Sequence, residues 1–223
     1  MDLREEQLKE REILRYLGCQ VAEPPEELVR AVRKGRQEIV AAARPKIVWR
    51  LFPLEGAHPL GTSVTFQGGD IARHLAGCHA VILMAVTLGP EIESLLLRAQ
   101  VRDMSHALVL DACASTGVEA VCDRLEADFR AEWEAKGNYL TDRFSPGYGD
   151  LPITQQSELC ALLDTQRRIG LTLSSSGIMI PRKSVTAILG IADTPRHRRS
   201  RGCQGCAIYE HCQMRKGGTP CGS

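Results

Sequence analysis

The spacing of apolar residues predicts two amphipathic helices in the first 45 residues of the chain. Residues 2–17 are mostly strong helix formers, and their apolar positions fall near one helical face, except for Leu8. A second helix is expected to begin after Pro24-Pro25 and to continue to about Ala43, because Pro45 cannot extend it. Its buried face is expected to consist of Leu28, Val29, Val32, Ile39 and Val40.

The middle of the chain predicts strands separated by short helices. Residues 46–52 are rich in branched and aromatic side chains, and residues 61–67 alternate between apolar and polar, which favours a strand in each case. Residues 79–88 are apolar almost throughout, which is typical of a central strand buried on both faces. Short helices are expected at 71–76 and 92–99.

The longest predicted element is a helix from Ser105 to about Lys136. This segment lacks proline and is rich in Ala, Leu, Val and Glu. Its first half, residues 106–120, is mostly apolar or small, so we expect burial on nearly all sides. Gly117 is expected to be a soft point in the helix.

The pattern of residues 138–191 predicts strands on either side of one further helix. A short strand is expected at 138–143 and a helix at 154–168. Strands at 171–173, 178–180 and 184–191 would then form a meander. Strands interrupted by helices and followed by a run of strands predict an α+β fold with a central twisted mixed or antiparallel sheet flanked by helices.

Composition is consistent with one folded domain over residues 1–193. The chain has 223 residues, of which 43% are hydrophobic and 25% are charged, so it can bury a sizeable core. Its 28 basic and 27 acidic side chains nearly balance, which argues against a nucleic-acid partner for the whole surface. The N-terminus is charged, and the apolar run 80–86 falls far short of the ~20 residues that span a bilayer. We therefore expect a cytoplasmic protein without a membrane partner.

The composition changes in residues 194–223. Residues 194–202 form a basic linker, for which a solvated charged segment is the simplest interpretation. Four cysteines follow, and four thiolates so close together can bind either zinc or an iron-sulfur cluster of the 4Fe-4S type. They are Cys203, Cys206, Cys212 and Cys221. Their spacing does not distinguish the two metals, and disulfides are disfavoured in a cytosolic chain. The remaining cysteines are expected to be reduced core residues, namely Cys19, Cys78, Cys113, Cys122 and Cys160.

The segment from Arg143 to Asp150, Arg-Phe-Ser-Pro-Gly-Tyr-Gly-Asp, combines residues suited to a small ligand. An arginine can bind a carboxylate through two parallel hydrogen bonds. Gly147 allows main chain to approach a ligand closely, and the ring of Tyr148 can face a cation. The pattern favours a pocket for a zwitterion, with an ordinary turn in which Asp150 caps the next helix as the alternative.

This segment and the residues around it resemble a known family. Arg143–Asp150, followed by Arg168–Ser174 and Met179–Thr186 and preceded by Ala85–Glu91, is similar to the C-terminal reactivation, or activation, domain of cobalamin-dependent methionine synthase. That family carries an Arg-x-x-x-Gly-Tyr signature that binds S-adenosylmethionine. The resemblance covers roughly residues 40–192 and implies the fold of that domain.

The resemblance also implies a function and a set of binding residues. Arg143 would receive the methionine carboxylate of S-adenosylmethionine, and the backbone around Ser145 and Gly147 would hold the amino acid or adenosine. Tyr148 would lie against the ligand near its sulfonium. In that family an oxidised, inactive cobalamin is rescued by one electron and a methyl group, so the expected function is reductive reactivation of a cobalamin-dependent methyltransferase.

Two departures from the family shape the expected partners. No Asp-x-His-x-x-Gly motif and no recognisable folate, homocysteine or cobalamin domain occur in these residues. The cobalamin is therefore expected on a partner, either methionine synthase or another corrinoid protein. The four-cysteine tail is an addition, and an iron-sulfur cluster there would relay an electron from a low-potential donor. The acidic binding residues stay open among Glu55, Glu91 and Asp142.

Two other functions are consistent with the same residues. One is a non-catalytic S-adenosylmethionine sensor or assembly module whose cysteine tail binds a structural zinc. The other is a reductive activator of a different corrinoid methyltransferase. Binding of S-adenosylmethionine without remethylation of a partner's cobalamin would favour the sensor.

Overall fold

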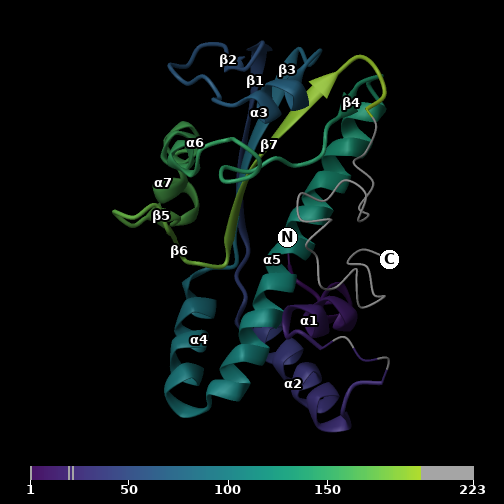
Figure 1. The fold of residues 1–223 in the computed structure, drawn as a ribbon, viewed down its shortest axis with the longest axis vertical. Coiled ribbons are helices and arrows are strands. Elements are labelled where there is room, and N and C mark those ends of the chain that lie inside the picture. The colour runs from purple at the N-terminus through teal and green to yellow at the C-terminus, as the bar shows by residue number, and fades with distance from the viewer. Residues whose placement is uncertain (1, 20, 22, 197–223) are drawn as a thin grey trace.

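A five-stranded sheet organises the computed structural model, which describes residues 2–19, 21 and 23–196 (Figure 1). The strand order is β2-β1-β3-β7-β4, and every neighbouring pair is antiparallel. The strands of this sheet are β1 (Lys46–Glu55), β2 (His58–Pro59), β3 (Ala80–Thr87), β4 (Tyr139–Leu140) and β7 (Ser184–Ala192). The short strands β5 (Thr172–Leu173) and β6 (Met179–Ile180) pair with each other in a separate two-stranded sheet.

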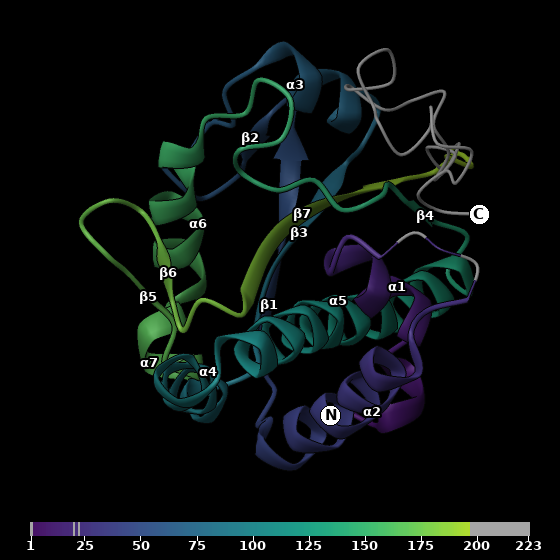
Figure 2. The same ribbon diagram turned by 60° about the horizontal axis from the view of Figure 1, so that its bottom comes forward.

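Helices cover both faces of the large sheet (Figures 1 and 2). One face carries α1 (Glu10–Tyr16), α2 (Glu26–Ala42) and α5 (Met104–Glu134), with α4 (Pro90–Arg102) packed against α2 and α5. The other face carries α3 (Gly69–Leu75), α6 (Gln156–Leu163) and α7 (Thr165–Ile169). Two single 3-10 turns, Glu5–Gln7 and Ile153–Gln155, precede α1 and α6.

β3 lies at the centre of both cores. All eight of its residues are buried, and its side chains alternate between the two apolar clusters. Ile82, Met84 and Val86 point toward the α5 side, and Val81, Leu83 and Ala85 point toward the α3 and α6 side. The prediction of a central strand buried on both faces is confirmed. An apolar run without alternation is what a strand between two helical layers requires.

The long helix α5 is continuous through the predicted soft point at Gly117. Its 31 residues extend for about 46 Å at 1.5 Å per residue. The absence of a side chain at Gly117 lets the helix approach its neighbours, because a Cβ there would lie 3.1 Å from Leu3 Cδ2 and 3.5 Å from Leu88 Cδ1. Gly117 is therefore a packing residue and does not break the helix.

The predicted α+β class, with an antiparallel sheet flanked by helices, is confirmed. The strand predicted at 61–67 is wrong, since these residues form turns and extended coil. Their alternating burial is real, because Val64 and Phe66 are both buried. Their polar groups bond outside any strand ladder, however: Phe66 N–H donates to the Ala57 carbonyl, and the Gln155 side chain bonds to both the Thr65 carbonyl and Gln67 N–H. The Val64 carbonyl lies 2.7 Å from a ring nitrogen of His58. Alternation of burial therefore did not imply sheet pairing here.

Three further expectations about local structure need correction. The helix predicted at 2–17 begins only at Glu10. Leu8 lies between the first 3-10 turn and this helix, and its side chain is fully buried in the core. The helix predicted at 154–168 is interrupted at Asp164, which has a positive φ of 50° and separates α6 from α7. The three late strands do not form one meander, because only β7 joins the large sheet.

No helix in residues 2–19, 21 and 23–196 combines the length and apolar character that crossing a membrane would need. The described cysteines are all free. Cys78, Cys113, Cys122 and Cys160 are buried, as expected, and Cys19 is partly buried.

Candidate functional site

The segment from Arg143 to Asp150 is attached to the edge of β7. Phe144 and Ile188 exchange two backbone hydrogen bonds, with N···O distances of 2.9 and 2.8 Å. The Ser145 hydroxyl donates to the Thr186 carbonyl at 2.7 Å. The main chain directly after Arg143 therefore follows a buried strand, and its position is set by the sheet.

The Pro-Gly-Tyr turn follows this attachment. Gly147 has a φ of +90°, a conformation that residues with a Cβ rarely adopt. Its N–H donates to the Leu151 carbonyl at 2.9 Å, and Tyr148 N–H donates to the Ser145 carbonyl at 3.0 Å. The Tyr148 side chain stays 60% exposed, with its ring edge-on to Phe144 at 6.3 Å between centroids. The turn thus presents an aromatic ring at the surface.

Asp150 ends the segment by capping α3. Its Oδ2 accepts a hydrogen bond from Gly69 N–H at 2.7 Å, and its Oδ1 accepts one from Asp70 N–H at 2.9 Å. These bonds to the carboxylate, with the bond from Asp70 contributing most, hold the pKa of Asp150 below its ordinary value. The expectation that Asp150 caps the next helix is wrong, because the capped helix lies about eighty residues earlier.

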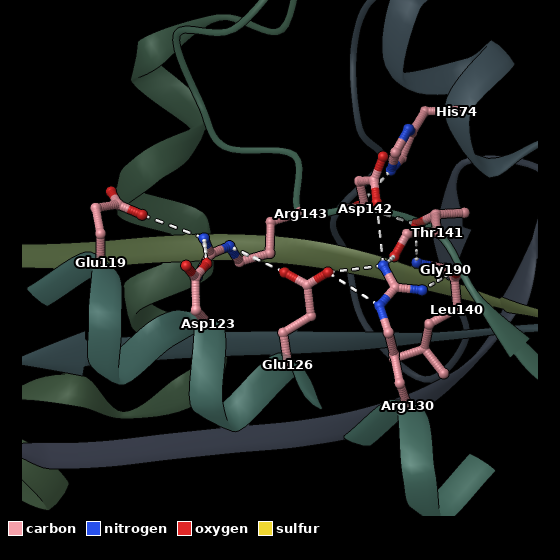
Figure 3. Close-up of polar contacts among 10 residues, drawn as sticks. All are labelled: His74, Glu119, Asp123, Glu126, Arg130, Leu140, Thr141, Asp142, Arg143 and Gly190. Carbon is pink, nitrogen blue, oxygen red and sulfur yellow. Dashed lines mark hydrogen bonds and ion pairs between the residues drawn. The ribbon is translucent and has the colours of Figure 1, made fainter. Parts of the chain in front are cut away.

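The Arg143 side chain points away from the turn toward α5, where three carboxylates surround it (Figure 3). Its Nη2 lies 2.7 Å from Asp123 Oδ1 and 3.2 Å from Glu119 Oε2. Its Nε lies 3.3 Å from Glu126 Oε2. The three acidic residues follow one another at spacings of four and three along α5, so they share one face of the helix.

The third nitrogen of Arg143 is different. Nη1 is buried, and within the described part of the chain it has no hydrogen-bond partner. Burial of the guanidinium opposes its charge, but Cys122 and the three carboxylates outweigh it and raise the pKa of Arg143 above its ordinary value. The site therefore contains a permanently charged guanidinium with one buried donor nitrogen that has no acceptor in the described part of the chain.

A second arginine, Arg130, lies one turn beyond Glu126 on α5. Arg130 donates from Nε and Nη2 to Glu126 Oε1 at 3.1 and 2.7 Å. It also donates to the carbonyls of Leu140 and Thr141 at 2.7 and 2.9 Å. The side chains of Arg130 and Glu126 are only 9% and 11% exposed. Glu126 thus bridges two guanidinium groups in a buried network (Figure 3).

The network continues into the strand that leads to Arg143. Asp142 Oδ1 lies 3.1 Å from Arg130 Nη2, and the Asp142 carbonyl lies 2.8 Å from a ring nitrogen of His74 on α3. Thr141 Oγ1 accepts a hydrogen bond from Gly190 N–H of β7 at 2.8 Å. The approach to Arg143 is therefore held by α5, α3 and β7 together (Figure 3).

The N-terminal helix α1 brings an unexpected residue to this region. Tyr16, at its last position, is 49% exposed. Burial of the remainder, followed by the carboxylate of Glu119, raises the pKa of Tyr16, and Tyr148 adds to this effect. Tyr16 therefore lies close enough to Glu119 and Tyr148 for their charges to act on it.

The structure brings together some of the predicted site residues and adds others. Arg143, Ser145, Gly147 and Tyr148 lie in one anchored turn. Of the candidate acidic residues, Asp142 joins the network through Arg130. The other two do not: Glu55 lies at the end of β1, opposite His58 of β2 in the sheet, and Glu91 lies beside Gly89 at the start of α4. The carboxylates that pair with Arg143 were missed. The residues missed by sequence reasoning are Tyr16, Glu119, Asp123, Glu126 and Arg130.

The proposed metal ligands lie outside the described residues. Cys203, Cys206, Cys212 and Cys221 all fall in residues 197–223, so the four-cysteine site stays a prediction. Among residues 2–19, 21 and 23–196, no three His, Cys, Asp or Glu side chains are grouped so that they could bind a metal ion.

The antiparallel sheet between helical layers is similar to a fold that has been solved before. The chain matches a crystal structure of the MetH reactivation domain bound to AdoHcy with a TM-score of 0.63. The match covers 96% of this chain and 83% of that chain at 17% sequence identity. The two proteins share a fold.

The sequence itself identifies the family. The model of the vitamin B12 dependent methionine synthase activation domain matches residues 71–197, more than half of the 223 residues. The protein therefore belongs to the activation-domain family of vitamin B12 dependent methionine synthase. No curated protein matches the chain. The matched range includes the segment Arg143–Asp150, called the Arg143 turn below, and the acidic face of α5, whereas Tyr16 lies before it.

Proposed function

We propose that the protein reactivates a cobalamin-dependent methyltransferase, in the first instance methionine synthase, by binding S-adenosylmethionine as methyl donor. Its family and the fold it shares with a domain solved with AdoHcy support this proposal. The observation that carries it is the guanidinium of Arg143. Its side chain is charged and only 15% exposed, and its buried Nη1 has no partner among the described residues. A buried donor without a partner is costly unless a ligand supplies the acceptor.

The charges of the site complement those of S-adenosylmethionine. This ligand carries one carboxylate and two cationic groups, the ammonium and the sulfonium. In the proposed complex, Nη1 of Arg143 donates to the carboxylate. The surrounding network contains four carboxylates against two guanidinium groups, so it has a formal excess of negative charge. Glu119 and Asp123 are the more exposed members, with side chains 39% and 44% exposed, and are available to the cationic groups.

The turn would position the remainder of the ligand. The Ser145 hydroxyl and the Gly147 N–H already bond within the chain, so their proposed contribution is the course of the main chain and the open space at Gly147. The exposed ring of Tyr148 would lie against the ligand near its sulfonium. Tyr16, near Tyr148 and Glu119, would add a second aromatic surface from α1.

The chain's own residues would bind and orient the donor. The cobalamin of the partner supplies the cobalt centre that accepts the methyl group after one-electron reduction. Holding the donor with its methyl group exposed raises the effective concentration of that group at the partner. We propose that the Arg143 turn, at the surface near Tyr148, does this.

Calorimetry with S-adenosylmethionine tests the binding site. Replacement of Arg143 by Ala removes the donor to the ligand's carboxylate, so we expect the Kd to rise about 10- to 100-fold, as for loss of a hydrogen bond to a charged group. Arg167→Ala is the matched control, because Arg167 forms only an exposed pair with Asp164 and its side chain is 86% exposed. An unchanged Kd in Arg143→Ala would contradict the site assignment.

A second measurement tests the reaction. Partner protein holding cob(II)alamin is mixed with a reductant, S-adenosylmethionine and this protein, and the return of methylcobalamin absorbance is followed. We expect the absorbance to return with wild type and to be slowed with Arg143→Ala. Tight binding of S-adenosylmethionine without remethylation would support the sensor function instead.

A further inference from the structure

We propose that Glu126 and Arg130 form a clamp on α5 whose function is to position the guanidinium of Arg143 for a ligand carboxylate. The proposal rests on the proposed function, because it names the residues that hold the ligand-binding arginine in place. The clamp acts at two points, on the main chain before Arg143 and on the Arg143 side chain (Figure 3).

Arg130 fixes the main chain. Its Nη1 and Nη2 donate to the carbonyls of Leu140 and Thr141 at 2.7 and 2.9 Å. These carbonyls belong to the third and second residues before Arg143, in the segment that runs along β7 from β4 to Phe144. Two hydrogen bonds from one planar group hold this segment against α5, so the Cα of Arg143 is placed relative to α5.

Glu126 fixes the side chain. One of its oxygens, Oε2, pairs with Arg143 Nε at 3.3 Å, while the other, Oε1, accepts from Arg130 at 2.7 Å. Nη2 of Arg143 is held by Asp123 and Glu119. Because a guanidinium is planar, fixing Nε and Nη2 also fixes the direction of Nη1. The nitrogen that lacks a partner in the described chain is therefore aimed by residues that do not bind it.

The charges of this arrangement support a positioning role. A buried ion pair is weak evidence for stability, because desolvation of its charges offsets their attraction. Apolar side chains could fill the same space on α5, whose first half is packed in that way. Glu126 and Arg130 each make several directed contacts instead, and all of those contacts lead to Arg143 or to the residues just before it.

Two variants separate positioning from stability. Glu126→Gln keeps the shape of the side chain and removes its charge. The double variant Glu126→Met with Arg130→Met removes both charges together, so neither is left buried without its partner. Glu132→Gln is the matched control, since Glu132 near the end of α5 also forms an i,i+4 pair, with Lys136 just beyond the helix, but both side chains are about half exposed. Thermal midpoints confirm that each variant folds.

The primary readout is the nitrogen-15 spectrum of the arginine Nε–H groups, which needs no ligand. In wild type, the Arg143 Nε–H signal, assigned by its loss in Arg143→Lys, should exchange slowly with water, since Nε is paired with Glu126 Oε2 at 3.3 Å and the Arg143 side chain is only 15% exposed. In Glu126→Gln and in the double variant we expect this exchange to accelerate at least tenfold. Glu132→Gln should not change it. Fast exchange in the wild type itself would overturn the clamp, even if every variant failed to fold.

The second readout is the Kd for S-adenosylmethionine, measured by calorimetry. We expect about a tenfold rise in Glu126→Gln, and no further rise when Glu126→Gln is added to Arg143→Ala, because Glu126 acts through Arg143. Equal effects of Glu126→Gln in both backgrounds would overturn the positioning role. A wild type with a protected Nε–H signal that binds no S-adenosylmethionine would overturn the proposed function, and the ligand role of the clamp with it.

Discussion

The two halves of α5 use one helix for opposite purposes. Residues 104–117 pack against α2 and α4 through apolar and small side chains such as Leu110 and Cys113, both fully buried. Residues 118–134 instead carry the buried charges of Glu126 and Arg130 toward the Arg143 turn. The same backbone therefore supplies core packing at one end and a network of buried charges at the other.

This difference separates stability from recognition. Apolar packing is non-directional and tolerates several side chains of similar volume, whereas the contacts of Glu126 require particular atoms at particular distances. Changes in the first half of α5 should therefore alter the free energy of unfolding and leave ligand affinity intact. Changes in the charged half of α5 should instead alter ligand affinity more than the free energy of unfolding.

The largest effect is expected from Leu110→Ala in the apolar half. Leu110 is fully buried where α5 packs against α2, so the cavity left by the substitution should lower the free energy of unfolding by about 2–5 kcal/mol. The Kd for S-adenosylmethionine, measured on the folded protein, should not change. Leu108→Ala is the control, because Leu108 is 59% exposed on the same helix. A weakened Kd in Leu110→Ala alone would show that the two halves are not separable.

An intermediate effect is expected from the two thiols, one in each half. Burial is the main cause that raises the pKa of both Cys113 and Cys122 from 9.0 to about 12. The unfolded chain loses these protons near pH 9 and the folded chain does not. The contribution of each thiol to the free energy of unfolding is therefore fully present below pH 9. As the pH rises toward 12, the free energy of unfolding declines by about 1.4 kcal/mol per pH unit for each thiol.

Urea unfolding between pH 8.5 and 10.5 measures this decline. Cys113→Ala and Cys122→Ala should each reduce the slope by a similar amount, even though Arg143 lowers the pKa of Cys122 while its carboxylate neighbours raise it. A slope unchanged by Cys122→Ala alone would mean that the charged half of α5 admits water as a surface does.

The smallest effect is expected where the halves meet, from Gly117→Ala. Alanine gains up to about 1 kcal/mol in helix propensity over glycine. The new Cβ would meet Leu3 Cδ2 at 3.1 Å, the end of a flexible side chain that can move, so we expect net stabilisation of about 0.5 kcal/mol in chemical denaturation. Destabilisation above about 1 kcal/mol would show that the junction is packed too rigidly for Leu3 to adjust.

Hydrophobic pattern was sufficient for the apolar half of α5 and for the central strand β3. The unbroken run of β3 and the proline-free sequence of α5 predicted their burial, because the number and spacing of apolar residues determine which faces leave water. The Arg143 turn was also found from sequence, since Arg, Gly and Tyr occur within six residues.

The charged half could not be found in this way. Glu119, Asp123 and Glu126 have the spacing of a solvated helix face, and only the tertiary position of Arg143 distinguishes a buried network from an exposed one. Asp150 and Tyr16 meet partners about eighty and one hundred residues away, and local pattern carries no information on such contacts. The strand predicted at 61–67 failed for the same reason, because the Thr65 carbonyl and Gln67 N–H bond to the side chain of Gln155, about ninety residues away, and not to a neighbouring strand.

The capping of α3 by Asp150 affects the thermodynamics of ligand capture. The turn is attached to β7 at Phe144 and to α3 at Asp150, so its backbone has lost most of its conformational entropy when the chain folds. A ligand meeting an already ordered turn avoids an ordering cost of about 1–2 kcal/mol for each residue that would otherwise have to be fixed. In the proposed complex, Asp150 would thereby contribute to affinity through preorganisation of the turn, with no need to contact the ligand itself.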